Sequence, residues 1–363
     1  MEKDEIIVIY GNTPEEMAYR LAQAAELENL IGDTSKRVGL KPNLVVARPA
    51  DGGATTHPEI AAGLIRYLHE KGFRNLVILE GSWVGDSTRQ AFPRCGYTAL
   101  AKQAGVELID TQRDTYTSRD CKGMKIEICD SALAVDFMIN LPVMKGHCQT
   151  AITCALKNNK GIMSDREKQR FHSLGLHKPI AHLNSAARND FIVVDGICGD
   201  LDFEEGGNPI PAGRMFAARD PVLCDAWVAD QMGYSLAEVP YIPMAAALGV
   251  GSSDIKKARV RELNSSKDAP LMPRPSGKAR QLGSLVQEDK SCSACYAALI
   301  RALSRMSRNE TARLKSPICI GQGFQGKTGE IGIGRCTKGF SASVPGCPPG
   351  AAEIMGFLRT RLS

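Results

Sequence analysis

Four cysteines near the C-terminus have the residue type and spacing of a metal centre. Cys292 and Cys295 form a C-x-x-C pair, Cys336 follows a glycine-rich turn, and Cys347 lies in the proline-rich segment 344–350. The pair precedes a predicted helix, whose N-terminus favours negative charge, and the prolines fix the backbone around Cys347. One tight pair with two separate cysteines favours an iron–sulfur cluster, expected to be 4Fe–4S, over the two close pairs of a zinc ribbon.

Zinc bound by the same thiolates, and thiols without any metal, are the alternatives. Cys319 lies in a strand-like run and is expected to face the core. The remaining cysteines are expected to be small buried side chains; they are Cys95, Cys121, Cys129, Cys148, Cys154, Cys198 and Cys224. The charged N-terminus resembles no signal peptide, so we expect a cytoplasmic protein, in which 12 cysteines predict no disulfide framework.

A second group of polar residues in the first 250 positions predicts a substrate crevice. Several of them follow predicted strand ends, and open α/β sheets bind ligands beyond the carboxyl ends of their strands. The expected catalytic residues are Lys145 as anion holder, His147 as proton donor and His57 as a second proton-transfer group. The expected substrate-binding residues are Lys41, Asn43, Thr56, Lys157, Asn158 and Asp195.

The surrounding elements alternate between short apolar runs and helical patterns. This alternation predicts an α/β fold, with a mostly parallel sheet covered by helices on both faces and a small C-terminal α/β iron–sulfur unit. The expected boundaries are 1–255 for the α/β domain, 256–290 for a basic linker or excursion, and 291–363 for the cluster-binding unit. Within the first domain we expect one helix over 14–30, a helix capped by Thr56, and a solvated acidic loop over 196–213.

Charge and apolar patterning limit the partners. The net charge is +5, and residues 256–315 hold 14 Lys or Arg against five Asp or Glu. We expect a solvated linker there; the alternatives are docking of an acidic redox partner or of nucleic acid, and the lack of basic–aromatic interleaving disfavours the latter. No apolar run of about 18 residues predicts a membrane helix. The oligomeric state stays open, with a homodimer among the options.

The chain resembles two kinds of known protein. Motifs such as Lys41-Pro42-Asn43, Met144-Lys145-Gly146-His147 and Val194-Asp195-Gly196 resemble, in their order, the family known as domain of unknown function 362. This resemblance spans nearly the whole chain and implies the iron–sulfur-binding version of the fold, but no substrate. The segment Val344–Pro349, with the earlier cysteines, also resembles the cluster-binding part of the complex I proximal-cluster subunit and of hydrogenase small subunits.

These observations favour an oxidoreductase in which the cluster relays electrons to a small anionic substrate. Two other classes remain: a non-catalytic electron-transfer or accessory protein, and a lyase or isomerase in which the cluster is a Lewis acid or a structural brace. The sequence lacks G-x-G-x-x-G, Walker A, G-x-S-x-G and H-E-x-x-H motifs. It therefore predicts no standard nicotinamide dehydrogenase, NTPase, α/β-hydrolase or zincin.

Overall fold

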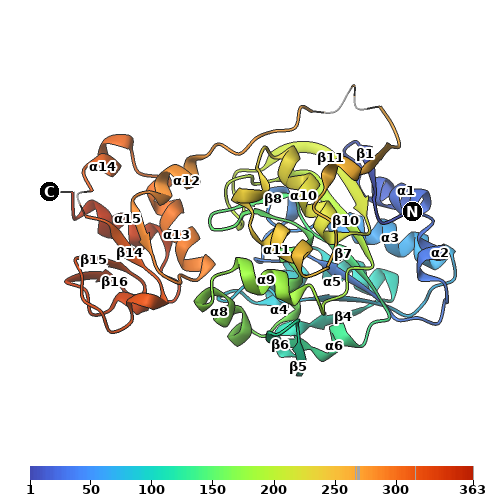
Figure 1. The fold of residues 1–363 in the computed structure, drawn as a ribbon, viewed down its shortest axis with the longest axis horizontal. Helices are drawn as coiled ribbons and strands as arrows, with labels where there is room; N and C mark the ends of the chain where they lie inside the picture. The colour runs from blue at the N-terminus through green and yellow to red at the C-terminus, as the bar shows by residue number, and fades with distance from the viewer. Residues whose placement is uncertain (266, 268–269, 315, 363) are drawn as a thin grey trace.

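The computed structural model describes residues 1–265, 267, 270–314 and 316–362 (Figure 1). In this part of the chain, an eight-stranded sheet forms the centre of a larger unit, in the order β12-β1-β11-β10-β7-β2-β3-β4. Its strands are β1 (Glu5–Tyr10), β2 (Val38–Pro42), β3 (Leu76–Glu80), β4 (Glu107–Asp110), β7 (Phe137–Leu141), β10 (Phe191–Gly199), β11 (Ile210–Ala218) and β12 (Arg259–Glu262). Only β11 runs antiparallel to its neighbours. The predicted α/β fold with a mostly parallel sheet is confirmed.

Helices cover both faces because successive side chains of a strand point to opposite sides. In β1, Ile6 and Val8 join one core while Ile7 and Ile9 join the other. The helices that contribute to the second core are α1 (Pro14–Ala25), α2 (Leu27–Ile31), α3 (Pro58–Glu70), α4 (Thr88–Arg94) and α5 (Tyr97–Ala104). The helices that contribute to the first core are α6 (Asp130–Leu133), α7 (Ala155–Asn158), α8 (Asp165–Ser173), α9 (His177–Leu183), α10 (Pro221–Gln231) and α11 (Tyr241–Ala247).

Two small hairpins complete the larger unit. Strands β5 (Tyr116–Asp120) and β6 (Lys125–Cys129) form one, and β8 (Lys145–His147) and β9 (Ala151–Thr153) form the other. The second hairpin lies close to the carboxyl ends of the central strands, because an isolated bridge joins Val143, just before it, to Asp195 of β10. It therefore carries Lys145 and His147 to the edge of the sheet where ligands are expected.

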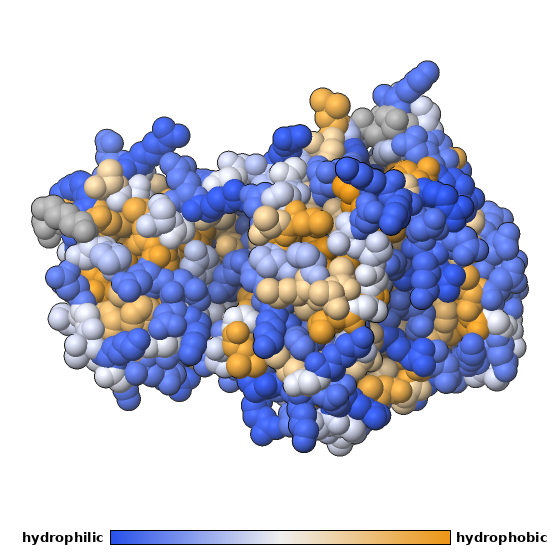
Figure 2. All heavy atoms as spheres, viewed as in Figure 1, coloured by the Kyte–Doolittle hydropathy of each residue, from blue (hydrophilic) through white to orange (hydrophobic). Residues whose placement is uncertain are grey.

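The C-terminal unit is a separate small lobe (Figures 1 and 2). Its parallel strands are β13 (Val286–Glu288), β14 (Ile318–Ile320), β15 (Ile331–Ile333) and β16 (Ala342–Val344). Its helices are α12 (Lys278–Gly283), α13 (Ser293–Ser304), α14 (Arg308–Ala312) and α15 (Ala351–Arg359). Phe203 of the larger unit joins the hydrophobic core of this lobe, so the two units share a packed contact.

Several local expectations are corrected by the structure. The helix expected over 14–30 is broken at Glu26, which has a φ of 51° and separates α1 from α2. His57, not Thr56, precedes α3, because the Thr56 hydroxyl donates to the Leu141 carbonyl at 2.7 Å and accepts from the Asn43 amide at 2.9 Å. The loop expected over 196–213 is shorter, since β10 extends to Gly199 and β11 begins at Ile210.

The segment 256–290 is divided between the two units. Strand β12 pairs with β1 of the large sheet, whereas α12 and β13 belong to the C-terminal unit. Residues 266 and 268–269 of this segment lie outside the described residues. Within the described residues, no helix combines the length and hydrophobicity that crossing a bilayer requires.

Candidate functional site

Lys41 and Glu80 end neighbouring parallel strands and form a buried ion pair. The Lys41 Nζ lies 2.5 Å from a Glu80 carboxylate oxygen, and both side chains are almost fully buried. Burial lowers the pKa of Lys41 and raises that of Glu80, while their mutual attraction opposes both shifts. Glu80 faces the cavity described below, and Lys41 lies behind it as the neutralising partner.

Lys145 is held by three oxygen atoms. Its Nζ donates to Asn43 Oδ1 at 3.1 Å, to the Glu204 carbonyl at 2.9 Å and to the Ala54 carbonyl. Burial, and then the charge of Lys157, lower the pKa of Lys145 to about 7. Lys145 therefore braces the loops that carry Asn43 and Glu204, and Asn43 faces the cavity.

His57 and Asp195 form a buried pair of their own. The Asp195 carboxylate accepts from His57 Nδ1 at 2.8 Å and from the His57 backbone amide at 2.9 Å. Although burial disfavours the charged ring, the hydrogen bond to Asp195 raises the pKa of His57 to about 11. His57, Asp195 and Thr56 do not line the cavity described below, and neither do Lys41 and Lys145.

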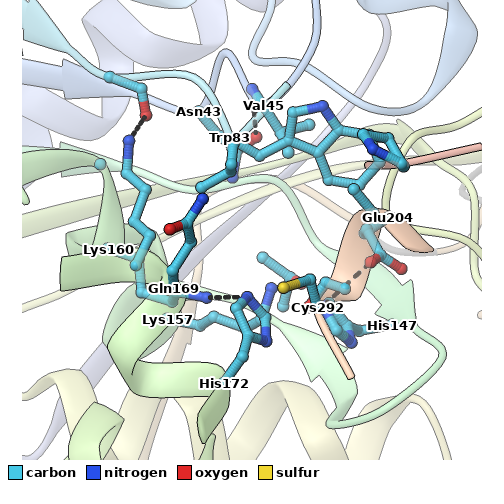
Figure 3. Close-up of a pocket in the computed structure, with 18 of the residues that line it drawn as sticks. Asn43, Val45, Trp83, His147, Lys157, Lys160, Gln169, His172, Glu204 and Cys292 are labelled. Atoms are coloured by element: carbon cyan, nitrogen blue, oxygen red, sulfur yellow. Dashed lines mark hydrogen bonds and ion pairs between the residues drawn. The ribbon is translucent and has the colours of Figure 1, made fainter. Parts of the chain in front are cut away.

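That cavity, here called the lysine pocket, lies at the carboxyl edge of the sheet and is lined by both units (Figure 3). Its volume, open mouth included, is about 810 Å³. Its polar walls come from Asn43, Glu80, His147, Thr153, Lys157, Asn158, Lys160, Lys168, Gln169, His172 and Glu204. Its apolar wall includes Val45, Trp83, Val84, Ala294 and Pro348, and Cys292, Cys295 and Cys347 also line it.

The lysines of this pocket differ in how they are paired. Lys168 is buried and donates to the Gly81 and Ser82 carbonyls and to Asp165. Lys157 Nζ lies 3.3 Å from Thr153 Oγ1, and Lys160 Nζ lies 3.5 Å from His172 Nε2. Burial lowers the pKa of Lys157 to about 8 and holds that of Lys160 well below its ordinary value. An anion beside them would therefore stabilise their charged forms.

His147 and Glu204 lie next to each other in the wall of the pocket. His147 Nδ1 accepts from the Gln149 and Thr150 backbone amides at 3.0 and 3.2 Å, so a neutral ring carries its proton on Nε2. This Nε2 lies 3.2 Å from Glu204 Oε1 (Figure 3). Burial, and then the charge of Glu205, raise the pKa of Glu204 to about 7. The acidic loop expected to be solvated is thus buried, with Glu204 only 2% exposed.

The acidic loop also joins the two units. Glu205 accepts from Arg301 of α13 at 2.7 Å, and the Arg301 guanidinium lies 5.0 Å from the centre of the Phe203 ring. Gln149 forms a second connection, since its side-chain amide donates to Ser291 Oγ at 3.0 Å and accepts from Ser293 Oγ at 2.8 Å. The Gln149 contacts hold the start of α13 against the larger unit, and the Arg301 contacts hold its last turn.

The four predicted cluster cysteines converge within the C-terminal unit. Cys292 precedes α13, Cys295 lies in its first turn, and Cys336 and Cys347 lie in loops after β15 and β16. Burial, and then the nearby Cys347 and Cys336 thiols, raise the pKa of Cys292 to about 11; burial and then Cys292 raise that of Cys295 to about 12. A shared metal centre would offset this cost of ionising the thiols, because it binds them as thiolates.

Side-chain amides lie near two of these thiols. Gln322 Nε2 lies 3.7 Å from Cys292 Sγ, and Gln325 Nε2 lies 3.5 Å from Cys336 Sγ. Amide donors next to the sulfur atoms fit the iron–sulfur group that the sequence predicts.

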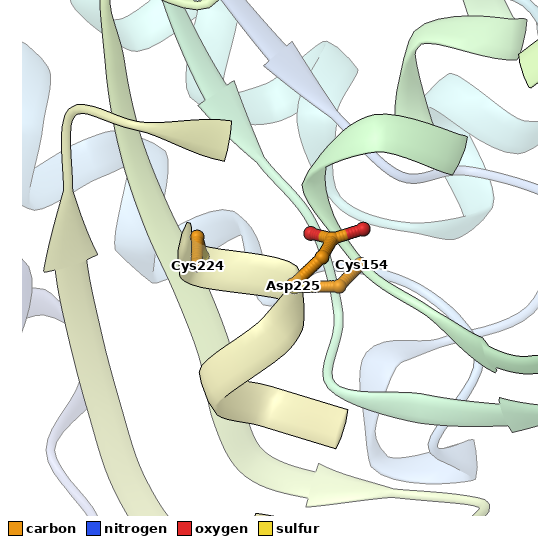
Figure 4. Close-up of side chains that lie close together, drawn as sticks. All are labelled: Cys154, Cys224 and Asp225. Carbon is orange, nitrogen blue, oxygen red and sulfur yellow. The ribbon is translucent and has the colours of Figure 1, made fainter. Parts of the chain in front are cut away.

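The other cysteines lie in different surroundings. Cys319 packs with Phe324 and Phe340, as its strand context predicts. In the described residues one compact group of metal-ligand type is found, formed by Cys154, Cys224 and Asp225 within 4.8 Å of one another (Figure 4). The Asp225 carboxylate accepts from the Ala155 and Leu156 amides at 2.7 and 3.2 Å, which explains its position as a cap of α7.

The structure thus brings together Asn43, His147, Lys157, Asn158 and three of the four cluster cysteines around one cavity. The predicted site residues do not include Trp83, Lys168, His172 and Glu204, which also line the pocket. Lys168 and His172 both lie on α8, four residues apart, and this one-turn spacing on a polar helix was the available signal.

The protein is therefore an α/β protein whose central sheet and C-terminal unit enclose a cavity lined by several lysines. The chain belongs to the family described as domain of unknown function (DUF362), whose model matches residues 38–230, so the resemblance seen in the sequence is confirmed at family level. The thylakoid-associated protein sll1697 of Synechocystis sp. (strain ATCC 27184 / PCC 6803 / Kazusa) is 24% identical over 225 residues. This alignment covers 59% of the present chain and 68% of that relative.

Two solved structures show partial similarity to the fold. The lactate racemase apoprotein from Thermoanaerobacterium thermosaccharolyticum aligns with a TM-score of 0.38 and 14% identity, covering 60% of this chain and 55% of that one. A structural-genomics structure of a Thermotoga maritima protein aligns with a TM-score of 0.36 and 14% identity, covering 66% and 60%. The chain therefore spans less than two thirds of the length of either solved chain.

Proposed function

We propose that this protein is an iron–sulfur enzyme that exchanges electrons with a small anionic substrate in the lysine pocket. The observation that supports this proposal is that Cys292, Cys295 and Cys347 line the same cavity as Lys157 and Lys160. A metal centre on these thiols would lie beside the bound substrate, which short-range electron transfer requires.

The metal centre and the pocket have separate tasks. When bound, a 4Fe–4S cluster held by Cys292, Cys295, Cys336 and Cys347 supplies single electrons. Lys157 and Lys160 bind the substrate anion, and the apolar wall around Trp83 excludes water. His147 and Glu204 hold a proton close to the substrate, since burial keeps His147 in its neutral form and raises the pKa of Glu204 to about 7.

Cysteine substitutions test the cluster. We expect anaerobically purified protein to contain about four irons per chain and to absorb broadly at about 400 nm. Cys336→Ala should lose most of the iron, whereas Cys319→Ala, the matched control, should keep it because Cys319 packs with Phe324 and Phe340. A colourless, zinc-containing protein would exclude the proposal, and iron loss in Cys319→Ala alone would reassign the fourth ligand.

A second candidate is a lyase or isomerase, with the cluster as a Lewis acid or brace. The pKa of Glu204, which lines the pocket, is about 7 and favours acid–base work at neutral pH. Turnover without an external electron donor or acceptor, with deuterium from heavy water incorporated into the product, would select this candidate over the redox enzyme. The cytoplasmic location and an acidic redox partner belong to the proposal and remain predictions.

A further inference from the structure

The lysine pocket has one wall suited to a negative charge. Among the described residues, no carboxylate oxygen lies within 4.0 Å of Lys157 Nζ or Lys160 Nζ, although other lysines of the chain have such partners. The buried Nδ1 of His172 also has no hydrogen-bond partner in the described chain. Lysines that are largely withdrawn from water without a counterion provide a binding site for an anion from outside.

The same pocket has a wall suited to a flat apolar group. Trp83 lies in the loop after β3, where its backbone amide donates to the Val45 carbonyl at 3.1 Å. In the view of Figure 3 the Trp83 indole lies above, and Lys157, His172 and Cys292 lie below. Across the described residues, neither an aromatic ring nor a cation is stacked on Trp83. A ring bound in the pocket can therefore stack on this indole without displacing an aromatic or cationic partner.

The charge of the pocket limits the kind of anion. The pocket is lined by three lysines, Lys157, Lys160 and Lys168, and by two carboxylates, those of Glu80 and Glu204. A second negative charge on the ligand would be repelled by the Glu204 and Glu80 carboxylates. These groups favour a carboxylate with a single charge over a phosphate dianion.

We propose that the ligand of the lysine pocket is a planar carboxylate, an aromatic or conjugated acid. Its carboxylate binds Lys157 and Lys160, and its ring lies against Trp83. The inference deepens the proposed function and rests on it for one reason: single-electron exchange leaves a radical on the substrate, and conjugation delocalises that radical. The binding geometry itself does not depend on the cluster chemistry.

Titration calorimetry of the iron-containing protein with four small probes tests the inference. Benzoate is the expected ligand, cyclohexanecarboxylate keeps the charge without the planar ring, benzamide keeps the ring without the charge, and phenyl phosphate doubles the charge. We expect benzoate to bind about three- to tenfold more tightly than cyclohexanecarboxylate, as aromatic stacking allows. Benzamide and phenyl phosphate should bind at least about tenfold more weakly than benzoate.

Substitutions locate the binding. Trp83→Leu should abolish the preference for benzoate over cyclohexanecarboxylate while both acids still bind. Lys160→Met should weaken both acids about tenfold or more. Lys102→Met removes an exposed lysine of α5 and should behave as the unchanged protein.

Three results would overturn the inference: equal binding of the two acids, phenyl phosphate or benzamide binding as tightly as benzoate, or an unchanged preference in Trp83→Leu. The two proposals fail separately. If the protein carries the cluster but does not bind benzoate, only the proposed ligand class is wrong. Protein that binds benzoate but holds no iron overturns the redox function and leaves the ligand class standing.

Discussion

At the scale of single residues, the lysine pocket concentrates groups whose charge changes near neutral pH. Glu204 is only 2% exposed, and burial, followed by the charge of Glu205, raises its pKa from an ordinary 4.5 to about 7. His147 and Lys157, which lie beside it, are shifted toward their neutral forms by burial. The protonation of these groups near neutral pH therefore differs between the folded protein and the unfolded chain.

Glu204→Gln should flatten part of the pH dependence of stability. Between pH 4.5 and about 7 the folded protein keeps a proton that the unfolded chain has released, so the free energy of unfolding falls as pH rises. The fall is at most about 1.4 kcal/mol per pH unit for this one group. Glutamine cannot ionise, so melting temperatures of the variant should exceed those of the unchanged protein more at pH 8 than at pH 5. Parallel melting curves across this range would contradict the assignment.

The same residues show how far sequence can identify a site. The sequence predicts Lys157 and Asn158 as substrate-binding residues, and the structure places both at the cavity. Trp83 and Glu204 lie in loops whose position depends on contacts distant in sequence, such as Trp83 N–H to Val45. A solvated and a buried acidic loop have the same composition, so only the fold distinguishes them.

At the scale of elements, the sequence was most informative where strands are buried on both faces. Strands β1, β3 and β7 are continuous apolar runs, which is the pattern that predicts a buried strand. Strand β11 lacks this pattern because Pro211, Gly213 and Arg214 interrupt its apolar run, and β12 lacks it because its residues are exposed. Pairing with β1 stabilises both, and this pairing is a long-range property.

Arg301→Ala should loosen α13 from the larger unit. Arg301 pairs with Glu205 at 2.7 Å, and both side chains are mostly buried, so removing the guanidinium leaves a carboxylate without its partner. We expect hydrogen exchange in the last turns of α13, where Arg301 lies, to become at least about tenfold faster. Arg305→Ala, at the exposed end of the same helix, is the matched control. Equal exchange in both variants would show that Gln149 and Phe203 suffice to hold the helix.

At the scale of the whole molecule, the predicted metal centre has two sides. Cys292, Cys295 and Cys347 face the lysine pocket, whereas Cys347 also lines an outer groove of the C-terminal unit. The outer groove is bordered by Arg335 and Lys338, both exposed. A substrate on one side and an electron-carrying partner on the other could therefore approach the same centre without competing. The positive border favours an acidic partner.

Charge reversal can distinguish this groove from the basic segment after residue 255 as the docking surface. Replacing Arg335 and Lys338 by glutamate should slow reduction of the protein by an acidic one-electron carrier about tenfold or more at low ionic strength. Salt should reduce the difference by screening, and reduction by a small uncharged reductant should be unaffected.

The matched control replaces Lys256 and Lys257, which lie beside the large sheet, by glutamate and makes the same change in net charge. Stopped-flow reduction rates measure both variants. If the control variant alone is slowed, the partner docks on the basic segment, and the outer groove is not the route by which electrons enter.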